Sequence, residues 1–257
     1  MSHIETNLAP AALPDVAHLT FGDLAFALKS GLADFRKAPQ FGLFFSTVYV
    51  LGGIVLVWLG AGTVEWTFAM TLGFPLIAPF AAVGLYEVSR RIDRGAAMDW
   101  YKILSVVKSE KDRQVPWMGA IILIYFLFWS FLAHMIFALF MGLSVMRNVS
   151  TSYEVFLTPN GLTMIGVELA VGAVLAFVLF SLTVTSLPHL LEKEVDFVTA
   201  MLLSVQVVKE NLLVMLVWAI SVAGLTFIAM LPLFLGLLVV MPVLGHATWH
   251  LYKRALV

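Results

Sequence analysis

The chain contains 257 residues, of which 61% are hydrophobic and 12% are charged. A soluble domain is roughly half apolar and a quarter charged, so this composition predicts a membrane protein. The net charge of −1 argues against a nucleic-acid partner. Because the sequence lacks cysteine, disulfides, thiolate metal sites and cysteine catalysis are excluded.

Apolar runs of about 20 residues predict six transmembrane helices. They extend over Gln40–Gly60, Trp66–Tyr86, Trp117–Met141, Leu162–Leu187, Leu212–Met230 and Leu233–Leu251. The last two runs are nearly continuous, which leaves either a tight hairpin or one long kinked span. The predicted fold is an all-α polytopic membrane protein, with residues 1–39 as a soluble leader and 40–257 as the membrane domain.

The distribution of lysine and arginine predicts the orientation of the chain. Of the 15 basic residues, all except Arg147 lie in the leader, in the even-numbered connections or in the tail. Under the positive-inside rule these segments are cytoplasmic, so both termini are expected on the cytoplasmic side.

Three cytoplasmic segments share a pattern: an acidic and an aromatic residue, a short amphipathic helix, and a basic residue before the next span. They lie in the leader and at about 90–115 and 190–210. The apolar faces include Leu24, Leu28 and Leu32 in the first, and Phe197, Met201 and Val205 in the third. We expect these helices to lie in the headgroup layer. The pattern fits three parallel units of one interfacial helix and two spans, although basic and aromatic flanks are common in all membrane proteins.

Four stretches resemble a known family: "PFAAVGLYEVSRRIDRG", "SLPHLLEKEVDFVTAMLLSV", "VKENLLVMLVWA" and "PVLGHATWHLYKRAL". They are similar to the bacterial integral membrane proteins classified as domain of unknown function 2189. The resemblance implies a proteobacterial inner-membrane protein without an established activity. Some family members carry names that link them to cytochrome c oxidase. The resemblance implies no catalytic residues.

Two histidines in the tail, His246 and His250, lie one helical turn apart, about 6 Å from each other, which suits a shared metal ion. A haem bridging them to His134 is excluded, because His134 lies about 20 Å away in depth. A cytoplasmic metal site could instead combine them with His189 and with Glu192 or Glu194. The favoured interpretation is an interfacial anchor, with packing as a second role and no cofactor. The anchor residues would be His246, Trp249, His250, Tyr252, Lys253 and Arg254.

His134 and Glu168 form a second candidate pair inside the membrane. Each lies about six residues from the outer end of its span, which places both about 9 Å below the surface. An acid inside a span is costly and requires a partner or a water-filled cavity. The pair is therefore a proton or cation relay or a structural lock between two spans, or else Glu168 bonds Arg147 instead.

Small residues recur at a spacing of four in the fourth span, at Gly166, Ala170, Gly172 and Ala176, and such faces let helices approach closely. The basic flank with Arg90, Arg91 and Arg94 is a candidate for lipid-headgroup contact. Nucleotide-binding, zinc-protease and nucleophile-elbow motifs are missing from the sequence, so we expect no enzymatic activity.

Three functions remain open. The favoured one is a non-catalytic accessory, assembly or scaffold subunit of a larger inner-membrane complex, with a respiratory complex as one candidate and with the lipid bilayer and other membrane subunits as partners. The alternative is a small transporter or channel that uses Glu168. The third is a metal or redox enzyme built on the cytoplasmic histidines.

Overall fold

The described residues fold almost entirely into helices, as the apolar runs in the sequence predict. The structure is a computed structural model that describes residues 14–58, 64–142 and 156–256. Within these ranges the α-helices are α1 (Phe21–Lys37), α2 (Pro39–Trp58), α3 (Val64–Asp93), α4 (Trp100–Ser109), α5 (Val115–Met141), α6 (Pro159–Thr183), α7 (Ser186–Glu192), α8 (Phe197–Glu210), α9 (Leu212–Met230) and α10 (Leu237–Ala255), with a 3₁₀ turn η1 (Glu110–Asp112). The all-α prediction is confirmed.

Local signals in the sequence set the helix ends. Thr20 and Asp23 form a capping box at the start of α1, and Asp99 and Asp196 cap α4 and α8 through their side chains. Gly142 ends α5 with a φ of 76°, a conformation that glycine adopts without strain. These caps satisfy the free backbone groups that every helix end leaves.

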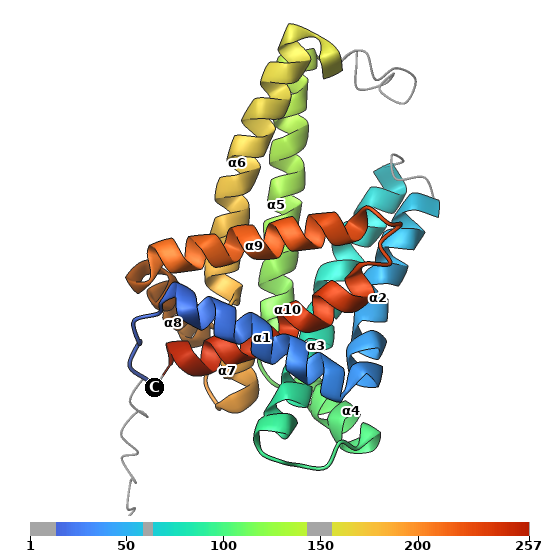
Figure 1. Ribbon diagram of the computed structural model, residues 1–257. Coiled ribbons are helices and arrows are strands. Elements are labelled where there is room, and N and C mark those ends of the chain that lie inside the picture. Colours follow the sequence, from blue (N-terminus) through green and yellow to red (C-terminus); the bar gives the residue numbers. More distant parts are fainter. Residues whose placement is uncertain (1–13, 59–63, 143–155, 257) are drawn as a thin grey trace, which may run out of the picture.

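Three described stretches are long and apolar enough to cross a membrane: Val115–Met141, Pro159–Glu192 and Leu212–Met230. The bent pair Phe21–Lys37 and Pro39–Val55 makes a fourth if its two helices, which meet at 106°, count as one span. The exact count of six spans stays a prediction. In Figure 1, α5 and α6 run side by side and extend beyond the other helices, whereas α1, α9 and α10 run across them.

The leader packs on the end of the chain. The isolated bridge between Val16 and Leu256, together with a 2.9 Å hydrogen bond from Ala17 N to the carbonyl of Ala255, joins the two segments. Asn211, between α8 and α9, accepts from Leu19 N at 2.6 Å and donates to the carbonyl of Ala17 at 3.0 Å. The described part of the leader is therefore held against the membrane domain.

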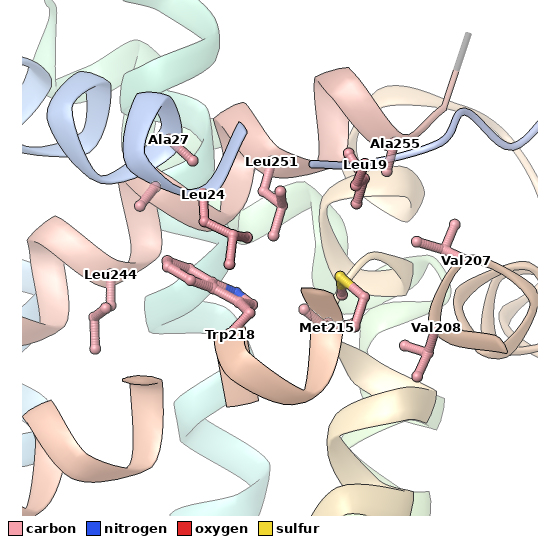
Figure 2. Close-up of a cluster of buried hydrophobic side chains, with 12 residues drawn as sticks. Leu19, Leu24, Ala27, Val207, Val208, Met215, Trp218, Leu244, Leu251 and Ala255 are labelled. Carbon is pink, nitrogen blue, oxygen red and sulfur yellow. The ribbon is translucent and has the colours of Figure 1, made fainter. Parts of the chain in front are cut away.

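A buried apolar cluster lies beneath α1. Figure 2 shows Leu24 of α1 beside Trp218 and Met215 of α9, with Leu244 and Leu251 contributed by α10. The apolar face that the sequence predicts for the leader helix thus packs on other helices of the same chain. Further along this same buried face, α1 carries the polar residue Asp34.

Candidate functional site

Polar side chains from three helices meet in the interior, in a group that we call the polar core: Asp34 of α1, Ser89 of α3, and His246 and His250 of α10. The Ser89 hydroxyl donates to Asp34 Oδ2 at 2.8 Å and lies 2.8 Å from His246 Nδ1. His250 Nε2 lies 2.7 Å from the same oxygen of Asp34. Ser89 and His246 have no exposed surface, and Asp34 is 3% exposed.

The polar core contains the residue types of a hydrolytic triad but not its arrangement. The Ser89 hydroxyl donates its single proton to Asp34, so it accepts from the Nδ1–H group of His246. A catalytic histidine would have to take the serine proton, and the serine would have to reach a substrate. Because Ser89 is completely buried, this arrangement can hold α1, α3 and α10 together but cannot present a nucleophile.

A second polar group, the ionic group, lies where α3 meets the start of α5. Glu87, which is 1% exposed, pairs with Arg90 and Arg91 of its own helix. Arg90 also donates to the carbonyl of Leu191 at 2.9 Å, so it connects α3 to α7. Glu110 pairs with the arginine three residues later in the chain, and burial raises the pKa of the Glu110 carboxyl.

These contacts show which of the three arginines predicted to contact lipid headgroups remain accessible. The side chains of Arg90 and Arg91 are only 17% and 16% exposed and are directed to Glu87. Arg94 is 59% exposed and lies 3.7 Å from Glu192, so it is the member of the trio with a free surface.

A third group forms where α7 meets the end of α10. The Tyr252 hydroxyl donates to Glu192 Oε2 at 2.7 Å, and Lys253 Nζ donates to both carboxylate oxygens of Glu192 at 2.9 and 3.2 Å. His189 Nδ1 lies 3.2 Å from the Tyr252 hydroxyl oxygen. The Trp249 indole donates to Asp93 at 2.7 Å.

Of the six residues predicted as an interfacial anchor, His250 has a side chain 13% exposed and pairs with Asp34 in the polar core, and the other five divide into two sets. His246, Trp249 and Tyr252 are at most 3% exposed and have polar partners on other helices. Lys253 and Arg254 have side chains 46% and 43% exposed, and Arg254 pairs with Asp23 at the start of α1. The packing role applies to the first set, and the anchor role stays a prediction for the second.

The three histidines considered for a metal lie in different surroundings. His189 contacts Tyr252, His246 contacts Ser89, and His250 contacts Asp34. In the part of the chain that the structure describes, no group of three histidine or acidic side chains is arranged to hold a metal ion.

His134 and Glu168 lie on α5 and α6, far from the polar core in the chain. Glu168 is partly exposed and interacts electrostatically with His134, whose Nδ1 donates to the carbonyl of Ser130 at 2.6 Å. Arg147, the third residue considered for this pair, lies outside the described residues.

Several buried polar residues were not predicted from the sequence, among them Asp34, Ser89, Glu87 and Glu110. One signal was available for Asp34, because it follows Leu24, Ala27 and Gly31 at helical spacing on the buried face of α1. A charged residue on such a face requires a partner elsewhere in the protein.

Comparison with known proteins identifies a family that matches part of the chain. Residues 67–192, which extend from the first turn of α3 to the last residue of α7, match the family described as "Predicted integral membrane protein (DUF2189)". No curated protein and no solved structure matches the chain. The predicted resemblance to this family of predicted integral membrane proteins is confirmed over residues 67–192.

Proposed function

We propose that this protein is a non-catalytic accessory, assembly or scaffold subunit of a larger complex in the bacterial inner membrane, with both termini cytoplasmic. The contact surface is the outer face of the α5–α6 hairpin. The cytoplasmic orientation rests on the distribution of basic residues.

The small buried fraction of this hairpin carries the proposal. In the most apolar 18-residue windows of α5 and α6, only 6% of residues are buried within the chain, against 22% in α9. The hairpin also extends beyond the other helices in Figure 1. Its surface is therefore left for lipid or for other proteins.

Small residues on α6 favour a protein partner on one side of the hairpin. Gly172 already faces Trp129 of α5, and a Cβ atom added at Gly172 would lie 3.1 Å from the indole ring. A Cβ atom added at Gly166 would have no atom of the described residues within 4 Å, and Ala170, one turn further, is exposed. Because small residues let helix backbones approach closely, this unused face suits a helix of another subunit.

Two matched substitutions test the proposal. Gly166→Leu fills the open face on α6, and Gly224→Leu is the control, because Gly224 on α9 also has open space around it. The tagged protein would be extracted from native membranes in mild detergent and sized on a native gel. We expect the wild type and Gly224→Leu to migrate as a complex larger than one chain, and Gly166→Leu to migrate alone.

Two results would reject the proposal. A wild-type protein that migrates as a single chain from native membranes would exclude a stable accessory role. Loss of the complex in Gly224→Leu but not in Gly166→Leu would move the contact surface to α9. The alternative, transport through Glu168, predicts instead that Glu168→Gln keeps the complex and abolishes the cellular activity.

A further inference from the structure

The long helices of the described residues fall into two sets by direction. In the first set, α2 runs antiparallel to α3, because Phe45 lies against Gly84 and the Tyr49 hydroxyl donates to the carbonyl of Ala78 at 3.0 Å. Further along the chain, α3 packs on α5, and α5 packs on α6. These four helices, which we call the upright set, run up and down the view in Figure 1.

α1 and α10 run across the upright set. α1 meets α2 at an angle of 106°. The end of α10 runs along α1 in the opposite direction, because Arg254 pairs with Asp23 and a Cβ atom added at Gly31 would lie 2.6 Å from Ala247 N. In Figure 1, both helices lie across α5 and α6.

α9 follows the direction of α1 and α10. At its start, Asn211 accepts a hydrogen bond from Leu19 N, just before α1. At its end, the Ala229 carbonyl oxygen would lie 2.6 Å from a Cβ atom added at Gly236, just before α10. α9 therefore extends along the pair of α1 and α10, and it also lies across α5 and α6 in Figure 1. A bilayer crossed by the upright set cannot be crossed by α9 in the same way.

Length and charge both indicate that the upright set crosses the bilayer. Its helices have 20 to 30 residues, so they measure about 30–45 Å, against a hydrocarbon core of about 30 Å. In the sequence, the connections after α2 and after α5 contain one basic residue, Arg147, whereas the other 14 lie before α2, between α3 and α5, or after α6. Four crossings also keep both termini on the cytoplasmic side.

The surface of α9 is apolar along its whole length. Leu213, Ile220 and Phe227 follow one another at intervals of seven residues, which places them on one face, and we call them the apolar stripe. Every exposed residue of α9 is apolar, whereas α8 exposes Lys209 and Glu210 immediately before it. A helix that faced water would not expose such a surface.

The turn between α9 and α10 has the same character. It exposes Leu231, Leu233 and Leu235, and no residue from 231 to 236 has a polar side chain. A spanning α9 would deliver this turn to the aqueous phase on the outer side. An apolar turn suits the interior of the bilayer instead.

We propose that α9 lies along the plane of the bilayer, in the cytoplasmic half of its apolar layer, with the acyl chains of that leaflet covering the apolar stripe. The described helices then cross the bilayer four times, through the upright set. The occupant is lipid because the stripe consists of large side chains, whereas faces that pack on other membrane helices are rich in small residues, as on α6. This inference does not depend on the proposed accessory function.

Spin labels can measure the depth of each stripe residue. The chain lacks cysteine, so single substitutions carry one label each: Leu213→Cys, Ile220→Cys or Phe227→Cys. The matched controls on α5 have the same spacing: Trp117→Cys, Ile124→Cys and Phe131→Cys. All six side chains are 59–68% exposed, so the labels should not disturb packing.

The full chain would be reconstituted in vesicles of phosphatidylcholine and phosphatidylglycerol. Collisions of each label with oxygen, which concentrates in the bilayer, and with a water-soluble nickel complex give its depth by electron paramagnetic resonance. Seven residues of a spanning helix advance about 10 Å, so the labels at 117 and 124 should differ in depth by about that amount. We expect the three α9 labels to lie within about 5 Å of one another, half of one such step.

Two results of this measurement would overturn the proposal. A label at Ile220 about 10 Å deeper than the label at Leu213 would show that α9 spans the bilayer. Labels on α9 that neither oxygen nor nickel reaches would show that a second copy of the chain, rather than lipid, covers the stripe.

The turn between α9 and α10 gives an independent test in intact cells. A membrane-impermeant thiol reagent added from outside should label Leu157→Cys, just before α6, and leave Leu233→Cys unlabelled. Both side chains are exposed, at 74% and 72%, so protein cover does not explain a difference between them. Equal labelling of the two variants would place the turn outside and overturn the proposal in favour of six spans.

Discussion

The polar core and the α5–α6 hairpin satisfy their polar groups in opposite ways. In the polar core, Asp34 and His246 are almost fully buried, and each has a hydrogen-bond partner on another helix. On the hairpin, His134 is exposed and Glu168 is partly exposed, and their mutual contact is electrostatic only. Contacts within the chain therefore define the first region far more completely than the second.

Because of this difference, substitutions in the two regions should change different measured quantities. Substitutions in the polar core should change the free energy of unfolding of the isolated chain, because its partners all belong to the chain. Substitutions on the outer face of the hairpin should change association with lipid or other subunits instead. The following predictions test this division.

The largest expected effect comes from Gly31, where α1 lies against α10. A Cβ atom at Gly31 would lie 2.5 Å from the Val243 carbonyl oxygen and 2.6 Å from Ala247 N. Because these are backbone atoms, Gly31→Leu must force the two helices apart and should cost about 3 kcal/mol or more. The measurement is folded yield and thermal unfolding in detergent.

Gly166→Leu on the hairpin is the matched control for this experiment. Since the space around Gly166 is open, the same substitution should leave the stability of the isolated chain within about 0.5 kcal/mol of the wild type. If Gly31→Leu and Gly166→Leu both unfold at the wild-type temperature, α1 does not lie in close contact with α10 at Gly31.

The acid of the polar core should give the next largest effect. Asp34→Ala removes the acceptor of Ser89 and the partner of His250, and leaves both groups buried. Breaking such a buried pair costs about 3 kcal/mol, which lowers Tm by about 6–12 °C in a chain of this size. Asp34→Asn keeps one acceptor oxygen and should lose less. An unchanged Tm in Asp34→Ala would contradict the polar core.

The apolar helices could be predicted from the sequence because membrane-scale hydrophobicity is a local property. The predicted span Leu212–Met230 coincides with α9, and Trp117–Met141 differs from α5 only in its first turn. The predicted run Leu162–Leu187 ends inside α7, because Val184 and Thr185 interrupt the helix without a proline or glycine. Hydropathy detects the apolar run but not such a break.

The contacts of the tail could not be predicted from the sequence. A tryptophan and a tyrosine near the end of an apolar helix have the same pattern in a headgroup belt as in a protein interior. Trp249 and Tyr252 are buried because Asp93 and Glu192, more than 50 residues away in sequence, supply their acceptors. Pairing over such separations depends on tertiary packing, which one sequence does not encode in any local pattern.

Substitution of Glu168 on the hairpin should change the stability of the chain less than substitution of Asp34 in the polar core. Glu168 has no hydrogen bond within the described residues, so Glu168→Ala should cost the isolated chain less than about 1 kcal/mol. Glu168→Gln should be stable and should retain the cellular activity. Both variants would be compared with Asp34→Ala by thermal unfolding and by growth of a strain that depends on the protein. A stable Gln variant without activity would favour the relay instead.

Two acids in the connections next to the hairpin should have effects of similar size that depend on pH. The Thr199 hydroxyl and backbone N–H donate to the carboxylate of Asp196 at 2.6 and 2.9 Å, which lowers the pKa of Asp196. Burial instead raises the pKa of Glu110. The pH dependence of their contributions to stability should therefore have opposite signs.

For Asp196, the folded state prefers the ionised carboxyl. Its stabilisation is fully present above the unfolded pKa of about 3.9 and is lost as the pH falls through the lower folded pKa. Asp196→Ala removes the cap of α8 and should cost about 1 kcal/mol at pH 7. That difference from the wild type should shrink as the pH falls below 4.

For Glu110, the folded state prefers the protonated carboxyl, because ionising a buried acid is costly even beside Arg113. This cost is present above the raised folded pKa and disappears as the pH falls through it toward the unfolded pKa of about 4.3. Glu110→Gln removes the charge and keeps the shape, so it should stabilise the chain at pH 7 by less than about 1 kcal/mol. The gain should vanish near pH 4. Thermal unfolding of each variant and the wild type from pH 4 to 8 measures both differences, and a loss of stability in Glu110→Gln at pH 7 would mean that the ion pair with Arg113 outweighs burial.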